Sequence, residues 1–274
     1  MVLYLIGLGL YNEKDISVRG LELVKSSDFI YMEYYTSILS VSKETLEKFY
    51  NKSIILADRD MIESDFEKEI IEKAKTHKVS LLVVGDPFSA TTHTDLYLRA
   101  INNDVKIEVL NNASIINACG VTGMSLYSFG EIISIPYFTE KWKPYSFYEK
   151  IKKNKDNKQH TLLLLDIKVK EVSEENLAKG KIIYEPPRFM NVNTALKQLK
   201  ESEDSLKHNI LNENTRYIAL ARVGAPDQLI ISGKFEDLIN YDFGKPLHSL
   251  IICSEYLHPI EEEMYNYYNI NKKN

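Results

Sequence analysis

The chain has 274 residues, of which 44% are hydrophobic and 27% are charged, and its formal net charge is -5. This length and composition are typical of a folded globular protein with one large domain or two modest ones. The negative net charge argues against a general binder of nucleic-acid backbones. No segment approaches the roughly 18 apolar residues of a membrane helix, and Met1 to Leu10 lacks the basic start and cleavage site of a signal peptide. We therefore predict a cytoplasmic protein with neither a membrane anchor nor a nucleic-acid partner.

The two cysteines, Cys119 and Cys253, form no Cys-x-x-Cys pair. No histidine or further cysteine lies near either of them at the spacing of a zinc site. Two scattered thiols fit a reducing compartment and exclude a disulfide framework. The sequence thus predicts no metal centre.

Strand-like and helix-like patterns alternate through the first half of the chain. Ser17 is a suitable cap for a helix through Val24, and the next helices are expected over 65–74, up to about Ala100, and after Ser114. The apolar runs predict strands at residues 3–7, 29–34, 54–56, 80–84 and 106–110. This alternation predicts an α/β fold with a mostly parallel sheet covered on both faces.

The second half has shorter connections. It predicts a helix over 193–199, an extended loop at 185–189, and strands at 161–167, 217–221, 229–232 and 250–253. Probable hairpins indicate a second α/β domain with mixed strand directions. Residues 148–159 hold five lysines and are interpreted as a loop, either a solvated linker or a docking point for an acidic protein surface.

The most informative segment is residues 83–96, where an apolar strand ends in Gly85-Asp86-Pro87 and a hydroxyl-rich loop follows. Ligands of open α/β sheets bind beyond the carboxyl ends of strands. Glycine lets the backbone approach a ligand, proline stiffens the turn, and Asp86, Thr91, Thr92 and His93 offer polar groups. The alternative is an ordinary turn with capping residues; the density of polar groups favours a ligand site.

Three further loops at expected strand ends support that interpretation. They are residues 112–118, 221–228 and 246–250, the last containing His248. A helix start with free N–H groups and small residues can hold a ligand, although each loop alone also fits an ordinary structural role. Gly7-Leu8-Gly9 is not a dinucleotide fingerprint, because Asn12 replaces the third glycine. Neither a P-loop nor a Gly-x-Ser-x-Gly elbow is present.

Taken together, these segments resemble the diphthine synthases, a branch of the tetrapyrrole-methylase-like S-adenosylmethionine-dependent methyltransferases. The resemblance runs from residue 3 to about 260. It is carried by Leu-Tyr-Leu-Ile-Gly-Leu-Gly-Leu, Val-Gly-Asp-Pro-Phe-Ser-Ala-Thr-Thr-His-Thr-Asp-Leu, Asn-Ala-Ser-Ile, Thr-Leu-Leu-Leu-Leu-Asp-Ile-Lys-Val-Lys-Glu, Tyr-Glu-Pro-Pro-Arg-Phe-Met, Ala-Arg-Val-Gly and Pro-Leu-His.

The resemblance implies two α/β domains, taken as 1–112 and 113–274, with the cofactor in the cleft between them and a homodimer as the assembly. By motif match, the residues that contact S-adenosylmethionine would be Gly9, Leu10, Asp86, Ser89, Ser114, Ile115, Leu165, Val223 and His248. The family commonly has glycine where this chain has Ser89, so a backbone contact survives there only if the turn does not demand positive φ.

The implied reaction transfers methyl groups to the 3-carboxy-3-aminopropyl-histidine of elongation factor 2 and leaves S-adenosylhomocysteine. Features of the chain look like the eukaryotic type, which methylates both the amine and the carboxylate. No general base is identified; His93 is the candidate. A methylase of the same fold acting on a small molecule such as a corrin precursor is one alternative, and an inactive cofactor-binding module is another.

Overall fold

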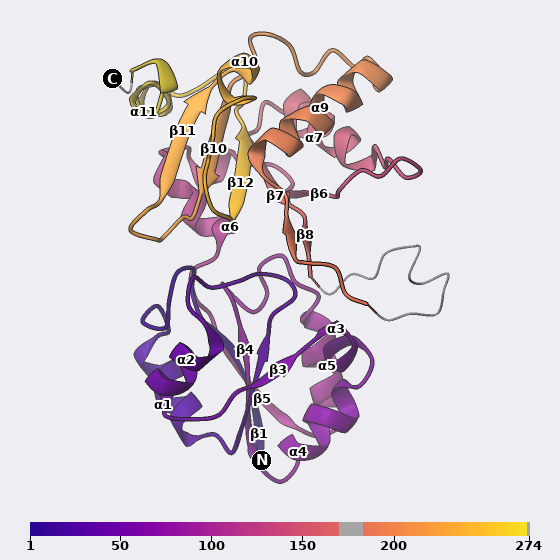
Figure 1. The fold of residues 1–274 in the computed structure, drawn as a ribbon, viewed down its shortest axis with the longest axis vertical. Helices are drawn as coiled ribbons and strands as arrows, with labels where there is room; N and C mark the ends of the chain where they lie inside the picture. The colour runs from indigo at the N-terminus through magenta and orange to yellow at the C-terminus, as the bar shows by residue number, and fades with distance from the viewer. Residues whose placement is uncertain (170–182, 273–274) are drawn as a thin grey trace. The chain divides into compact units, whose positions relative to one another are not determined.

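The computed structural model describes residues 1–169 and 183–272 (Figure 1). The chain divides into two compact units, Met1–Ile115 and Ile116–Asn274. Each unit is built on its own five-stranded sheet. Of the segments that carry the family resemblance, the one at 161–171 ends beyond the described residues, at Lys170 and Glu171.

The sheet of the first unit is entirely parallel, with the strand order β3-β2-β4-β1-β5. Its strands are β1 (Val2–Gly7), β2 (Phe29–Glu33), β3 (Ile55–Ala57), β4 (Lys78–Val83) and β5 (Lys106–Leu110). Every residue of β1 is buried. Its alternate side chains enter two different hydrophobic clusters, one with Leu3 and Leu5 and the other with Tyr4 and Ile6. The sheet is therefore covered on both faces, as the sequence predicts.

Two groups of helices cover these faces. The cluster around Tyr4 includes side chains of α1 (Val18–Ser26) and α2 (Lys43–Tyr50). The cluster around Leu3 includes side chains of the other helices, α3 (Arg59–Glu63), η1 (Glu67–Ile71), α4 (Glu72–Ala74) and α5 (Thr94–Asn102), or of residues next to them. Ser17 caps α1, since its Oγ accepts a hydrogen bond from the Gly20 N–H at 3.0 Å. Glycine fits at position 20 because a Cβ there would lie 3.1 Å from Ile6.

The sheet of the second unit is mixed, with the order β11-β10-β12-β7-β6, as expected from its short connections. Only β6 and β7 are parallel neighbours. The strands are β6 (Ile133–Ile135), β7 (Thr161–Leu165), β10 (Tyr217–Ala221), β11 (Leu229–Gly233) and β12 (His248–Ile252), with a separate pair β8 (Ile167–Lys168) and β9 (Arg188–Phe189).

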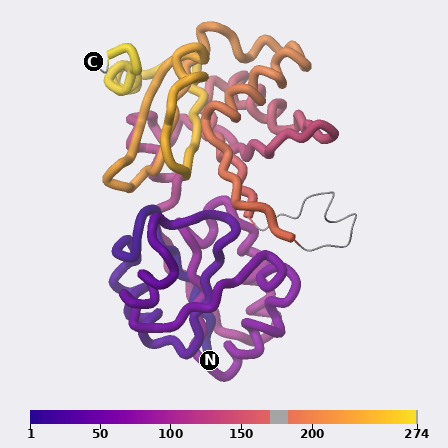
Figure 2. The backbone as a smooth tube through the Cα atoms, in the orientation of Figure 1, coloured from indigo at the N-terminus to yellow at the C-terminus, as the bar shows by residue number. Residues whose placement is uncertain are grey.

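One hydrophobic core holds this second unit together. Side chains of β7, β10 and β12 share a cluster with those of α7 (Ser146–Asp156) and α9 (Val192–Leu206). Figures 1 and 2 show the course of the backbone through these elements. In the part of the chain that the structure describes, the remaining helices are α6 (Ile115–Ala118), η2 (Cys119–Thr122), η3 (Leu126–Ser128), α10 (Phe235–Leu238), α11 (Pro259–Tyr267) and η4 (Ile270–Lys272). Within the described ranges, no helix is long and apolar enough to cross a bilayer.

The prediction of a loop at residues 148–159 is wrong, because most of this segment lies in α7. Tyr148 and Ile151 are fully buried, and Asn154 on the same helix face is 2% exposed. Lysines on the other positions obscure this spacing in the sequence. An amphipathic helix buries one face and exposes the other, so a lysine-rich helix can still be part of a core.

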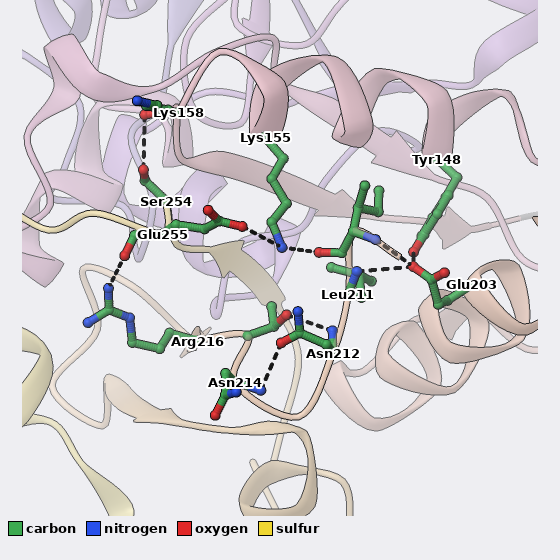
Figure 3. A network of polar contacts seen from close by, with 12 residues as sticks. Tyr148, Lys155, Lys158, Glu203, Leu211, Asn212, Asn214, Arg216, Ser254 and Glu255 are labelled. Carbon is green, nitrogen blue, oxygen red and sulfur yellow. Dashed lines mark hydrogen bonds and ion pairs between the residues drawn. The ribbon is translucent and has the colours of Figure 1, made fainter. Parts of the chain in front are cut away.

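The lysines of α7 are largely occupied within the unit. Lys150 pairs with Glu131, and Lys152 pairs with Asp156 one turn later. Lys155 donates to the carbonyl of Ile210 and lies 3.5 Å from a carboxylate oxygen of Glu255 (Figure 3). These contacts leave little free positive charge for a docking surface.

Candidate functional site

In the first unit, the chain segments after β1 and β4 are joined through two glycines. Gly9 donates its N–H to the carbonyl of Gly85 at 3.2 Å, and Gly85 returns an N–H to Gly9 at 2.7 Å. Their φ angles are 76° and 78°, a region that favours glycine. A Cβ on Gly9 would lie 2.6 Å from Asp15, whereas the nearest atom to one on Gly85 is 3.7 Å away. The backbone at Gly85 is thus the less crowded of the two.

The carboxylate of Asp86 fastens this loop to the segment that follows β5. Its Oδ1 accepts hydrogen bonds from the Phe88 N–H at 2.9 Å and from Ser89 Oγ at 3.3 Å. Its Oδ2 accepts from Asn111 Nδ2 at 2.9 Å and from the Asn112 N–H at 3.1 Å. Burial opposes ionisation of Asp86, but these four hydrogen bonds outweigh it and lower the pKa of the carboxyl.

Asn112 connects the same region to the segment after β1. Its Nδ2 donates to the carbonyls of Gly7 at 3.0 Å and Asp15 at 2.9 Å. Asp15 in turn accepts the N–H groups of Leu10 and Tyr11 on one carboxylate oxygen. The structure therefore brings six predicted positions into three mutually bonded loops: Gly9, Leu10, Asp86, Ser89, Ser114 and Ile115. Ser114 is 6% exposed and directly precedes α6.

Sequence reasoning did not single out Asp15 or Asn111 as part of this arrangement, although the second loop of interest began at Asn112. The available signal was the Asn-Asn pair directly after the strand at 106–110, since amide side chains often bond neighbouring backbone groups. Which loops they would tie together depends on contacts far along the chain.

Serine at position 89 is compatible with the turn. The φ angle of Ser89 is not positive, whereas the next residue, Ala90, has a φ of 61°. The backbone N–H of Ser89 bonds the carbonyl of Asp86 at 3.2 Å. The departure from glycine at position 89 therefore carries no backbone penalty, and the left-handed conformation falls on alanine instead.

His93 is buried, with 1% of its surface exposed. Its Nδ1 lies 3.0 Å from the carbonyl oxygen of Pro87, and its Nε2 lies 2.5 Å from Oε2 of Glu33. Oε2 of Glu33 has no well-aligned hydrogen bond among the described residues, so this contact is a close approach of the two side chains. Both ring nitrogens are thus engaged with the chain itself.

In the second unit, the predicted residues lie at one end of the mixed sheet, where three inner strands begin or end. Leu165 ends β7, and Val223 follows the end of β10 by two residues. The first residue of β12 is His248, which is registered against Ala221 of β10. The pairing of Ser249 with Leu164 brings the start of β12 beside the end of β7. Antiparallel pairing therefore places Leu165, Val223 and His248 at the same end of the sheet.

Arg222 fixes the loops at this end. Its Nη1 donates to the carbonyls of Phe243 at 2.8 Å and Lys245 at 2.7 Å. Its Nε lies 2.8 Å from the carboxylate of Asp227. The residue itself has a φ of 52°. The guanidinium thus connects the turn after β10 with the segment before β12, which leads into His248.

Among the described residues, one ring nitrogen of His248 has no hydrogen-bond partner. Its Nε2 lies 2.9 Å from the carbonyl of Lys245 and must carry the proton, because a carbonyl oxygen can only accept. Its Nδ1 is buried with no hydrogen bond. Burial is the main cause that lowers the pKa of His248, and the Arg222 charge acts in the same direction. A neutral imidazole with a buried free acceptor is suited to an N–H or O–H donor of a ligand.

Comparison with known proteins assigns the chain to a family. A sequence model of the Tetrapyrrole (Corrin/Porphyrin) Methylases matches residues 2–239. The chain belongs to this family. Among the described residues, no three His, Cys, Asp or Glu side chains are grouped so as to hold a metal ion.

Individual relatives are similar over their full length. The chain is 52% identical to the diphthine methyl ester synthase of Dictyostelium discoideum, covering 99% of this chain and 100% of that protein. It is 50% identical to the diphthine methyl ester synthase of Homo sapiens, covering 98% and 95%. A crystal structure from Entamoeba histolytica, of a protein assigned as a diphthine synthase, is 44% identical with a TM-score of 0.86 and covers 98% of both chains.

Proposed function

We propose that this chain is a diphthine methyl ester synthase. In this proposal it transfers methyl groups from S-adenosylmethionine to the amine and the carboxylate of the 3-carboxy-3-aminopropyl-histidine of elongation factor 2. The observation that carries the proposal is the identity of about 50% with enzymes of that name over almost the whole chain. The bonded loops around Gly9, Asp86 and Ser114 supply a ligand site of the kind that such a reaction needs.

The residues present fit the cofactor. S-adenosylmethionine supplies an electrophilic methyl group on a sulfonium and requires polar contacts to hold it. We assign the first unit's part of the binding to the backbone of Gly9, Leu10 and Gly85 and to Ser89, Ser114 and Ile115. In the second unit we assign it to Leu165, Val223 and His248, whose free Nδ1 is an acceptor for an amino or hydroxyl donor.

Asp86 has a different part in this assignment. A carboxylate offers about four lone-pair positions, and Asp86 already accepts four hydrogen bonds from its own chain. We therefore propose that its carboxylate holds the loops in the binding geometry, and that any cofactor contact at this position comes from the backbone.

The chain's catalytic contribution is alignment. In-line displacement at a methyl group requires the nucleophile, the methyl carbon and the leaving sulfur to be collinear, and holding them so accounts for much of the acceleration. A carboxylate nucleophile is ionised near neutral pH, whereas an amine must first lose a proton. Because both nitrogens of His93 are engaged and the side chain is buried, we no longer favour His93 as the base and assign none.

The two alternatives are less well supported. The family includes corrin methylases, yet the relatives that match the whole chain at about 50% identity carry the diphthine name. Against the inactive cofactor-binding module stands the naming of the relatives that match the whole chain at about 50% identity, which are called synthases.

We also propose a homodimer, which the family resemblance implies, and a cytoplasmic location, which the sequence predicts. Light scattering during gel filtration measures the mass of the assembly directly, and fractionation of cells locates it. A monomer at micromolar concentration would contradict the first expectation, and enrichment in membranes or organelles would contradict the second.

The decisive experiment incubates the enzyme and S-adenosylmethionine with elongation factor 2 that carries the 3-carboxy-3-aminopropyl group. We expect mass gains of whole methyl groups on the modified histidine and release of S-adenosylhomocysteine. Mild alkali then separates the two acceptors, because it hydrolyses a methyl ester and leaves methylated amines intact. Elongation factor 2 without the group is the matched control, and a corrin precursor tests the alternative. No mass gain on the prepared substrate would overturn the proposal.

A further inference from the structure

Glu33 lies at the end of β2, outside every segment assigned to the cofactor, and is 1% exposed. One of its oxygens accepts a hydrogen bond from the hydroxyl of Thr36. The other faces Nε2 of His93 at 2.5 Å. A carboxylate buried this completely is costly unless it is paired. Its partner, His93, contacts the Gly85-Asp86-Pro87 turn at the carbonyl of Pro87.

We propose that Glu33 is a positioning residue, which acts through His93 on the carbonyl of Pro87 and so sets the shape of the cofactor loop. Nδ1 of His93 donates to that carbonyl at 3.0 Å, and the hydroxyl of Thr91 donates to the same oxygen at 2.6 Å. These two donors hold the carbonyl of Pro87, which lies between Gly85 and Ser89 in the loop. The inference rests on the proposed cofactor role of this loop.

The proton inventory supports a fixed orientation of the imidazole. The carbonyl of Pro87 can only accept, so Nδ1 carries a proton. Nε2 is the ring atom that faces Oε2 of Glu33 at 2.5 Å, so the ring contacts the chain at both nitrogens. Loss of Glu33 removes one of these two attachments and allows the ring to turn away from Pro87.

The link spans neighbouring strands of one sheet. Strand β2 pairs with β4, and Met32 is registered against Leu82, so Glu33 and the start of the cofactor turn end up side by side. The strand on which Glu33 lies therefore provides a rigid anchor for this loop, in addition to its bonds through Gly85, Asp86 and Thr91. Rigid support of this kind improves binding by reducing the ordering cost.

Two substitutions of His93 separate the two contacts. In His93→Asn, the amide nitrogen takes the place of Nδ1 and can still donate to Pro87, but Glu33 loses its partner. In His93→Gln, the amide reaches Glu33, and the donor to Pro87 is lost. We expect His93→Gln to weaken S-adenosylhomocysteine binding about three- to tenfold in calorimetry. His93→Asn should bind close to wild type while melting at a lower temperature.

The role of Glu33 itself is tested by rescue. Glu33→Ala should weaken cofactor binding, and Glu33→Gln should restore most of it, because the amide can still contact Nε2 of His93. In the methylation assay, the KM for cofactor should rise for Glu33→Ala while kcat at saturating cofactor stays near wild type. Thr91→Val, which removes the other donor to Pro87 at a less buried position, provides a variant that should fold, with Thr91→Ser as its control.

A second buried pair in the same chain provides a matched control. His160 and Glu261 lie 3.2 Å apart in the second unit, and Glu261 also binds the backbone of Ser125 and His258. Glu261→Ala should lower the melting temperature without changing cofactor affinity. Equal affinity of wild type, Glu33→Ala, His93→Gln and Thr91→Val would overturn the inference. Absence of S-adenosylhomocysteine binding by the wild type would instead contradict the proposed function.

Discussion

The backbone N–H of Asn112 donates a hydrogen bond to Oδ2 of Asp86 at 3.1 Å, across 26 residues of chain. This bond ties the loop after β5 to the loop after β4. With the three other hydrogen bonds to the same carboxylate, it makes Asp86 the junction of both loops. Removal of the carboxylate should therefore disturb both the fold of these loops and their binding of the cofactor.

For Asp86→Ala, we expect the free energy of unfolding to fall by about 1.5 to 3 kcal/mol, as for a lost hydrogen bond to a charged group. Binding of S-adenosylhomocysteine should weaken as well. Chemical denaturation and calorimetry measure the two effects. Asp95→Asn is the control, since its side chain is 65% exposed and should have little effect on either. Loss of binding with unchanged stability would show that Asp86 touches the ligand and does not hold the loops.

Cofactor affinity should depend on the protonation of His248. Burial lowers the pKa of this imidazole from its ordinary 6.5, so the side chain is neutral at neutral pH and its Nδ1 can accept. As the pH falls through the lowered pKa, Nδ1 takes up a proton and the acceptor is lost. Calorimetry with S-adenosylhomocysteine should show constant affinity above pH 6.5 and weaker binding once the pH falls below the lowered pKa.

Two buried imidazoles, those of His160 and His248, predict how stability changes as the pH falls. Burial lowers the pKa of His160 and of His248, so the unfolded chain takes up protons before the folded one does. Stability from this source is complete above the unfolded pKa of 6.5 and falls as the pH drops below it. Thermal melts from neutral to acidic pH test this, and His160→Gln should show a shallower slope. A melting temperature independent of pH between about 7 and 5 would refute it.

Alanine substitutions at the paired glycines should differ in severity. Both positions have positive φ, but only at Gly9 would the new Cβ collide, 2.6 Å from Asp15. We expect Gly9→Ala to cost more stability than Gly85→Ala, for which the strain is about 1 to 2 kcal/mol. Ala90→Gly relieves the same strain at a φ of 61° and should be neutral or stabilising. Denaturant titrations of the three variants give the order, and equal losses for Gly9→Ala and Gly85→Ala would contradict it.

The lysines of α7 should matter for stability more than for association. The side chain of Lys155 is 13% exposed and contacts Ile210 and Glu255 (Figure 3). Lys152 instead makes an exposed pair with Asp156 one turn along the helix. We expect Lys155→Met to lower the melting temperature clearly and Lys152→Met to change the free energy by less than about 0.5 kcal/mol. Association with elongation factor 2 at low salt should be similar for both variants. A large loss of association rate for Lys152→Met would restore the docking interpretation.

Local pattern was enough to find the loops that carry the candidate site. Apolar runs located both sheets, and glycine, proline and hydroxyl residues marked the turns after β4, β5 and β10, because strand ends and turns depend on neighbouring residues. Five of the residues matched by resemblance follow those three strands: Asp86, Ser89, Ser114, Ile115 and Val223. Helix α7 escaped this approach, since its lysines obscure the spacing of the buried Tyr148, Ile151 and Asn154 that define its inner face.

Tertiary structure alone decided what each polar residue does there. Asp86 meets Asn112, and His93 meets Glu33, only because β1, β2, β4 and β5 are paired in one parallel sheet. Likewise, His248 has a free buried nitrogen only because its other nitrogen bonds Lys245 and the register of β12 buries the ring. Hydrogen-bond partners far apart in sequence are selected by strand order and register, and these are properties of the folded chain as a whole.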